Sequence, residues 1–178
     1  MAKPDQATGG VHEFNSGHNF SLTQRCDRYG QRMTTSSIDI DRPVADVFAY
    51  VTDPTLFHEW QEGVVSGGMK EAGVPTVGSH CTMTRRIGGA SRPSTSVVTK
   101  MNPPTTWAVH GLDGPIRALV DVTVHALDEA HSRVSIEVDF EGHGIGRVLV
   151  PLVVRRQAAK EMPANVLRLK NRLESRNP

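Results

Sequence analysis

The segment from Ser37 to Trp60 constrains the fold more than any other part of this 178-residue chain. Ile38 and Ile40 alternate with polar residues, which is the pattern of a strand with one buried face. Pro43 follows at a position that favours the start of a helix. Apolar residues then recur at helical spacing, namely Val44, Val47, Phe48 and Val51. The segment therefore predicts a strand that leads directly into a helix.

The dipeptide Asp53-Pro54 ends this first helix, because the residue before a proline is disfavoured in the helical conformation. Pro54 can itself begin a second short helix, which would carry Leu56, Phe57 and Trp60. We therefore expect two short helices after the first strand.

The middle of the chain, from about residue 62 to residue 141, alternates like a series of strands. The clearest alternation places Val134, Ile136, Val138 and Phe140 on one face. Turn signals separate the strands at Gly88-Gly89, Asn102-Pro103-Pro104 and Asp113-Gly114-Pro115. Short turns between successive strands imply an antiparallel sheet that has one face in water.

A long helix is predicted from about Gly146 to Glu174, and among the predicted elements it alone is long enough to cover the sheet. Its apolar residues fall on one arc of the helical wheel, namely Ile145, Val148, Leu149, Leu152, Val153, Ala159, Pro163, Val166 and Leu167. Pro163 should bend the helix. Beyond this bend the apolar face shifts toward Met162, Val166, Leu169 and Leu173.

Four features follow one another in this segment: a strand, the sequence Pro-Val-Ala-Asp-Val-Phe from Pro43 to Phe48, the dipeptide Asp53-Pro54, and Trp60. This order resembles the start of the START-like, or helix-grip, superfamily. The resemblance is strongest to its polyketide cyclase/dehydrase and lipid-transport branch, and it extends from Met33 to about Glu174. It implies an α+β fold in which a curved antiparallel sheet wraps around the long C-terminal helix and leaves a ligand cavity between them. This superfamily includes both lipid carriers and cyclases, so the resemblance indicates the fold more strongly than the function.

The chain divides into a flexible N-terminal arm (1–32), a START-like ligand-binding domain (33–174) and a short tail (175–178). The arm is rich in small and polar residues, and its isolated apolar residues, such as Phe20 and Leu22, form no stripe. Two alternatives stay open for it: translation that starts at Met33, and an arm that folds over the domain.

Composition excludes several classes of protein. A hydrophobic content of 38% is that of one ordinary soluble domain, and no apolar run is long enough to cross a bilayer. The net charge of +1 gives no reason to expect a nucleic-acid partner. Two cysteines make no disulfide framework, so a cytoplasmic location is expected.

No metal or cofactor is expected either. The eight histidines show no metal-ligand spacing. The stretch Gly142-His-Gly144-Ile-Gly146 lacks the strand, helix and acidic residue of a dinucleotide fingerprint. We expect it to give freedom to the corner between the last strand and the last helix, beside the mouth of the cavity.

The last helix and its flanks are basic, with Arg147, Arg155, Arg156, Lys160, Arg168, Lys170, Arg172 and Arg176. A solvated helix face explains this composition. The alternative is peripheral contact of the helix with an anionic membrane or another partner. The sequence makes no prediction of the oligomeric state.

Strand alternation and the helical wheel place ten residues around the expected cavity. They are Trp60, Met83, Arg85, Trp107, Val122, Val138, Phe140, Leu149, Leu152 and Arg156. Arg156 lies in the middle of the apolar arc, where it can bind a carboxylate, enolate or phosphate oxygen or extend its stem to water. Arg85 shares the alternation of Met83, yet it lies near its strand end and can reach solvent.

Two functions are compatible with these residues. The first is a protein that binds a hydrophobic or amphipathic small molecule, lipid-like or polyketide-like, in the cavity. The second is a cyclase or dehydrase that acts on a molecule held there without a metal or nucleotide cofactor. Catalysis requires positioned proton donors or acceptors. The sequence places few of these on the inward-facing positions, so we favour the binding function.

Overall fold

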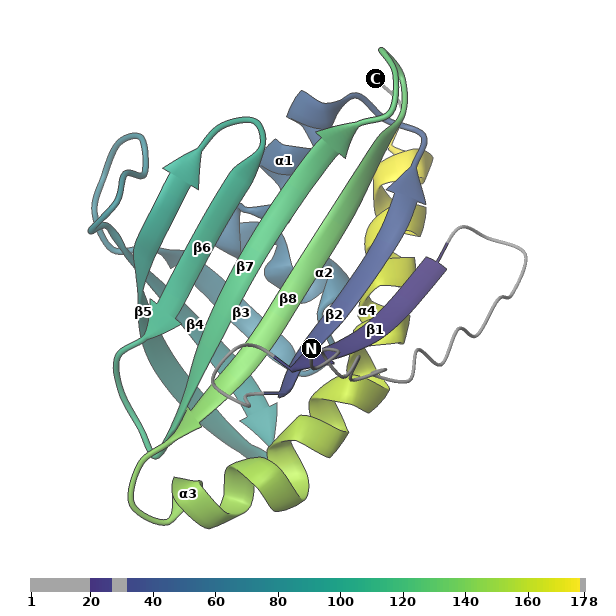
Figure 1. Ribbon diagram of the computed structural model, residues 1–178. Helices are drawn as coiled ribbons and strands as arrows, with labels where there is room; N and C mark the ends of the chain where they lie inside the picture. The colour runs from purple at the N-terminus through teal and green to yellow at the C-terminus, as the bar shows by residue number, and fades with distance from the viewer. Residues whose placement is uncertain (1–19, 27–31, 177–178) are drawn as a thin grey trace, which may run out of the picture.

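The structure is a computed structural model that describes residues 20–26 and 32–176 (Figure 1). Its strands are β1 (Phe20–Cys26), β2 (Arg32–Ile40), β3 (Val64–Met69), β4 (His80–Ile87), β5 (Ala90–Asn102), β6 (Thr106–Gly111), β7 (Ile116–Ala126) and β8 (Ser132–Gly142). Its helices are α1 (Val44–Val51), a 3₁₀ turn (Pro54–Leu56), α2 (Phe57–Trp60), α3 (Gly146–Leu149), a π-helical turn (Val150–Val154) and α4 (Arg155–Ser175).

The eight strands form one antiparallel sheet in the order β1-β2-β8-β7-β6-β5-β4-β3. The sheet curves, and α1, α2 and α4 lie against the same face, which we call the concave face (Figure 1). This arrangement confirms the predicted α+β helix-grip fold, including the two short helices after the first predicted strand and the long helix at the C-terminus.

Strand β1 corrects one prediction. Its segment was assigned to the flexible arm, but it pairs with β2 from Phe20 opposite Ile38 to Cys26 opposite Arg32. The free edge of β2 offers backbone donors and acceptors that a partner strand can satisfy whatever its side chains are. Hydrophobic alternation is a poor signal for such a strand. The other residues of the predicted arm, 1–19 and 27–31, lie outside the described residues.

A packed core occupies one half of the concave face. The sheet contributes Ile38, Ile40, Val122, Val124, Val134 and Ile136, while α1 and α4 contribute Val47, Val51, Val166, Leu169 and Leu173. Each of these side chains is at most 4% exposed. Their burial confirms the predicted strand alternation and the predicted apolar face of the helix beyond Pro163.

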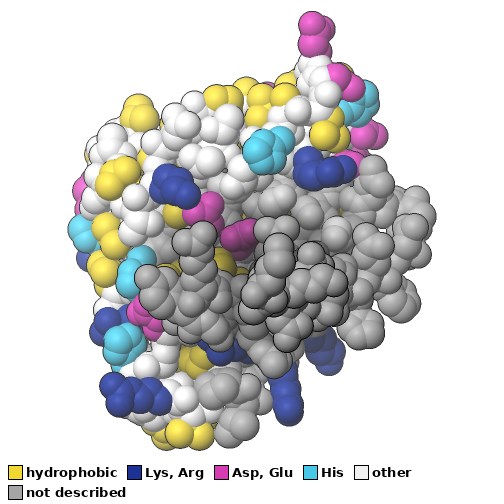
Figure 2. Space-filling view, in the orientation of Figure 1, with side chains coloured by type: hydrophobic (Ala, Val, Ile, Leu, Met, Phe, Trp, Pro, Cys, Tyr) yellow, Lys and Arg dark blue, Asp and Glu magenta, His cyan; other side chains and the backbone are white. Residues whose placement is uncertain are grey.

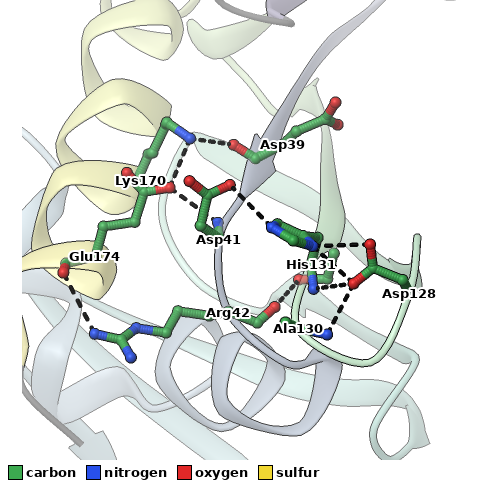
Figure 3. Close-up of polar contacts among 9 residues, drawn as sticks. Asp39, Asp41, Arg42, Asp128, Ala130, His131, Lys170 and Glu174 are labelled. Carbon is green, nitrogen blue, oxygen red and sulfur yellow. Dashed lines mark hydrogen bonds and ion pairs between the residues drawn. The ribbon is translucent and has the colours of Figure 1, made fainter.

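Arg42 attaches the end of α4 to the corner between β2 and α1 (Figure 3). Its Nε donates to the Leu173 carbonyl at 2.9 Å, and its Nη2 donates to the carbonyls of Glu174, at 3.3 Å, and of Arg176. The last carbonyls of a helix have no partner within the helix. Arg42 therefore satisfies these groups and places a positive charge at the negative end of the helix dipole.

Lys170 reinforces this attachment one turn earlier. Its Nζ donates to the Asp39 carbonyl at 2.8 Å and pairs with Glu174 Oε1 at 2.6 Å. The same Glu174 oxygen accepts a hydrogen bond from the Asp41 backbone N–H at 2.9 Å. The final turn of α4 is thus joined to the end of β2 through both side chains and backbone.

His131 lies beside this corner, in the turn between β7 and β8 (Figure 3). Its Nδ1 is 2.7 Å from Asp128 Oδ1, and its Nε2 is 4.0 Å from Asp41 Oδ1. The hydrogen bond with Asp128 raises the pKa of His131. The pKa of Asp128 is lowered, first by the hydrogen bond from the Ala130 backbone N–H and then by the one from His131.

We expect Arg42→Met to lower the free energy of unfolding by about 1–2 kcal/mol, because the carbonyls at the end of α4 lose their charged donor. Urea denaturation measures this change. Arg92→Met, at an exposed position of β5, is the matched control. Equal stability of the two variants would show that the attachment contributes nothing.

His131→Gln should lower the thermal unfolding midpoint in a pH-dependent way. A raised histidine pKa in the folded state contributes stability that is fully present below the unfolded pKa of about 6.5 and is lost as the pH rises through the folded value. The difference between wild type and variant should therefore be larger at about pH 6 than at about pH 8.5. A difference that does not change with pH would contradict this.

Candidate functional site

The predicted cavity residues Trp60, Trp107 and Val122 lie in the packed half of the concave face, each at most 4% exposed. Phe57 lies between the two indole rings, with ring centroids 5.9 Å from Trp60 and 6.1 Å from Trp107 in edge-to-face geometry. Trp60 Nε1 is buried without a hydrogen-bond partner among the described residues. The structure thus gathers these three residues in the core, and their contact with a ligand stays a prediction.

The other half of the concave face is less completely covered. Residues there share the inward alternation but are only half-buried, namely Met83, Ser94, Ser96, Ala118, Val120, Val138 and Phe140. The strand register places Met83 opposite Ser94, Val120 opposite Val138, and Ala118 opposite Phe140. We call this region the open half. It contains three of the predicted cavity residues, Met83, Val138 and Phe140.

A π-helical turn at the start of the C-terminal helix changes which side chains face the sheet. Within this turn the Arg155 N–H donates to the Val150 carbonyl, five residues back. Pro151 has no backbone N–H to donate to the Arg147 carbonyl four residues earlier, which favours a departure from the regular α-helical hydrogen bonds here. One extra residue in the turn lets Val150 and Arg155, five residues apart, both face the sheet, whereas a continuous α-helix would repeat that face after three or four residues.

The predicted apolar arc is wrong at the start of the helix, where the buried Gly146 and Val150, four residues apart, define the face toward the sheet. Ile145, Val148 and Val153 were predicted to face the sheet, but they are 70%, 58% and 56% exposed. Val150 is buried instead, at 3% exposure, and Leu149 is half-buried. The side chain of Leu152, another predicted cavity residue, lies outside those that the structure describes.

Farther along the helix, the predicted wheel selected the wrong one of two adjacent arginines, because Arg155 and not Arg156 lies seven residues before the buried Met162, on the same face of α4. Arg156 was the predicted cavity arginine, but its side chain is exposed. Arg155 is directed toward the sheet, where its Nη2 donates to Asp139 Oδ1 at 2.9 Å. Asp139 is 3% exposed and lies just beyond the last β2–β8 pair, Thr34 with Val138. Arg155 Nε is buried without a hydrogen-bond partner among the described residues.

An open pocket of about 450 Å³ lies beside this ion pair, between the end of β8 and the start of the helix. It is lined by Phe140, Glu141, Gly142, His143, Arg147, Val150 and Arg155. Glu141 Oε2 is 3.2 Å from His110 Nε2 and 3.7 Å from His143 Nε2. We call this pocket the corner pocket, and it holds charged groups within reach of the apolar open half.

Two glycines allow the chain to turn tightly at the corner pocket. A Cβ at Gly142 would lie 2.4 Å from the carbonyl carbon of Gly146, and a Cβ at Gly146 would lie 1.8 Å from the Pro115 carbonyl oxygen. Larger residues would therefore push α3 away from the sheet. The predicted role of this glycine-rich stretch in the strand-to-helix corner agrees with this geometry.

Arg85, at the opposite rim of the open half, is tied to the protein and not extended into solvent. Its Nη2 donates to Gln61 Oε1 at 2.9 Å, and its Nη1 donates to the Glu62 carbonyl at 3.2 Å. Glu161 Oε2 of α4 lies 3.8 Å from Nη1. Burial lowers the pKa of the Arg85 guanidinium, and the nearby Glu161 carboxylate partly opposes this shift.

Sequence reasoning missed Arg155, Asp139, Glu141 and Arg147. The signal for Arg155 was its place seven residues before Met162, on the face that the sequence already assigned to the helix beyond Pro163. Asp139 alternates onto the face opposite Val138 and Phe140, so strand parity assigned it to solvent.

Among the described residues, no group of three or more His, Cys, Asp or Glu side chains could hold a metal ion. Within the same part of the chain, no helix combines the length and the apolar character that a membrane span requires.

A family model described as polyketide cyclase/dehydrase and lipid transport matches residues 31–174. A comparison with curated protein sequences found no match.

Several solved structures share the fold. The Zhui aromatase/cyclase from Streptomyces sp. R1128 superposes with a TM-score of 0.68 at 12% identity, over 81% of this chain and 94% of that one. A START superfamily protein from Mycobacterium smegmatis gives a TM-score of 0.65 at 13% identity, over 80% and 97%. The di-domain ARO/CYC protein BexL of the BE-7585A biosynthetic pathway gives 0.64 at 16% identity, over 80% of this chain. This chain spans 46% of the length of BexL.

Proposed function

The chain belongs to the polyketide cyclase/dehydrase and lipid transport family, and from this premise we propose that it binds a hydrophobic or amphipathic small molecule, lipid-like or polyketide-like, between the sheet and the start of the C-terminal helix. The observation that carries the proposal is the open half of the concave face. Met83, Val120, Val138 and Phe140 point toward the helix there but remain half-buried. An apolar ligand would complete their burial.

The ligand that suits this surface is mostly apolar. Each methylene that a ligand buries contributes about 0.8 kcal/mol, while association costs several kcal/mol in lost freedom of motion. Useful affinity therefore requires a long chain or several fused rings. Ser94 and Ser96 provide hydroxyl groups on the same face, so a ligand with a few oxygen atoms fits better than a pure hydrocarbon.

An enzymatic function of the cyclase or dehydrase type is the second candidate. The names of BexL and of the Streptomyces aromatase/cyclase support it by analogy of fold. In this chain Glu161 and Arg85, at the rim of the open half, are the groups that could orient or protonate a bound carbonyl. An enzyme would release an altered molecule, whereas a carrier would release the molecule that it bound.

We also place the protein in the cytoplasm, on the basis of its two cysteines and its lack of a disulfide framework. Cys81 is free and buried in the structure.

The start of the C-terminal helix supports a proposal of peripheral membrane contact. Ile145, Val148 and Val153 are exposed there beside the exposed Arg147 and Arg156. Figure 2 shows apolar and basic side chains together at the lower end of the molecule, where α3 lies in Figure 1. Apolar side chains flanked by cations suit the surface of an anionic bilayer.

Ala118→Phe should weaken ligand binding roughly tenfold, because the added ring fills the open half opposite Phe140. Leu119→Phe is the control, since it places the same phenyl ring one position along the strand, on the opposite face. Nile red titration measures the affinity, and native mass spectrometry of freshly purified protein identifies a copurified ligand. Equal affinity in the two variants, or a wild-type protein that binds no apolar molecule, would contradict the proposed function.

Replacing both Ile145 and Val148 with Ser should reduce binding to phosphatidylserine-containing vesicles several-fold, at about 0.8 kcal/mol for each methylene lost from the interface. Vesicle cosedimentation measures this binding. Replacing Val74 and Val77, which are 88% and 62% exposed in the loop before β4, is the matched control. A protein that binds anionic and zwitterionic vesicles equally, or not at all, would contradict membrane contact.

A further inference from the structure

We propose that the corner pocket binds the anionic head group of the ligand, a carboxylate or phosphate, through hydrogen bonds from Arg155 and Arg147. The inference rests on the proposed function and adds to it the class of ligand: an amphipathic acid whose apolar part lies on the open half.

The first observation is the state of the Arg155 guanidinium. Its bond with the buried Asp139 fixes it at the pocket wall, so little freedom would be lost when a ligand binds. Its Nε–H is buried without an acceptor among the described residues. A buried donor without a partner is unfavourable. The bond to Asp139 uses only Nη2, so a ligand oxygen in the pocket could accept a hydrogen bond from the rest of the guanidinium without breaking it.

The second observation is the balance of donors and acceptors in the corner pocket. Two carboxylates, Asp139 and Glu141, oppose the charges of Arg155 and Arg147, so the formal charge of this set is near zero. Asp139 is paired with Arg155, and Glu141 Oε2 lies 3.2 Å from His110 Nε2, a contact that is ionic only when the histidine is protonated. Arg147 is exposed at the pocket and has no ion pair among the described residues. The N–H donors that the two guanidiniums still offer favour a ligand that brings acceptor oxygens.

The third observation is the position of the pocket relative to the apolar surface. Phe140 lines the corner pocket and also shares the inward alternation of Val138 and Val120. Val150 lines the same pocket and is buried. A head group held at Arg155 would thus have its apolar chain directed along Phe140 onto the open half.

The test compares three ligands with the same chain and different head groups: dodecanoate, dodecyl phosphate and dodecanol. Calorimetry with the full chain at about pH 8, where the carboxylate is ionised, measures the three affinities. Arg155→Met should weaken dodecanoate or dodecyl phosphate about tenfold or more relative to dodecanol, since hydrogen bonds to charged groups are the strong ones. The anion that loses more identifies the head group.

Arg156→Met is the matched control, because it removes the same charge from the next residue, whose side chain is exposed. It should leave the ratio of anionic to neutral affinity unchanged. Arg147→Met, at an exposed position, should lower that ratio without disturbing the fold. Arg155→Met leaves Asp139 buried and unpaired, so the double variant Arg155→Met with Asp139→Asn provides a form without that strain. This double variant should show the same loss of anion preference.

Three results would overturn the inference. The first is a ratio of anionic to neutral affinity that stays unchanged in both Arg155→Met and the double variant. The second is a change of this ratio in Arg156→Met as large as the change in Arg155→Met. The third is a wild-type protein that binds dodecanol but neither anion, which would leave the proposed function intact. If the wild type binds none of the three ligands, the proposed function fails and this inference fails with it.

Discussion

One long helix, α4, covers much of the concave face of an eight-stranded sheet beside the short α1 and α2, and its attachment at each end determines how much of that face is buried. At its C-terminal end, Arg42 and Lys170 join α4 to residues more than 130 positions earlier in the chain. The side chains beneath that end, such as Val166 and Leu169, are fully buried. Coverage is therefore complete near the β2–α1 corner, and the incomplete coverage lies toward the start of the helix.

The start of the helix is built differently because its backbone is constrained. Gly142 and Gly146 allow a close turn after β8, and the π-helical turn around Pro151 then sets the rotation of α4. The packing of Gly146 against Pro115 sets the face of α3, so Val150 turns to the sheet while Val148 lies in solvent. The face of α4 that carries the buried Met162 has Arg155 at its start. A charged side chain therefore lines the corner pocket, and exposed apolar side chains lie next to it.

The sequence predicted the parts of the fold that depend on simple periodicity. Alternation in β8 placed Val134 and Ile136 in the core, and helical spacing beyond Pro163 placed Val166 and Leu169 there. It failed where backbone geometry departs from the ideal period. The helix wheel was one residue out of phase before Pro163, so it selected Arg156 in place of Arg155. Strand β1 was missed because its place in the sheet depends on backbone pairing with β2 more than on an apolar face.

The candidate site was less predictable than the fold, because it depends on which polar groups remain available after folding. Arg85 and Arg155 are both half-buried arginines on the rim of the open half. The Arg85 guanidinium already donates to Gln61 and to the Glu62 carbonyl, so a ligand there would have to displace protein acceptors. Arg155 keeps one buried donor unpaired after its bond to Asp139. No sequence pattern distinguishes these two arginines, because the difference lies in the hydrogen-bond acceptors that the folded chain places around each guanidinium.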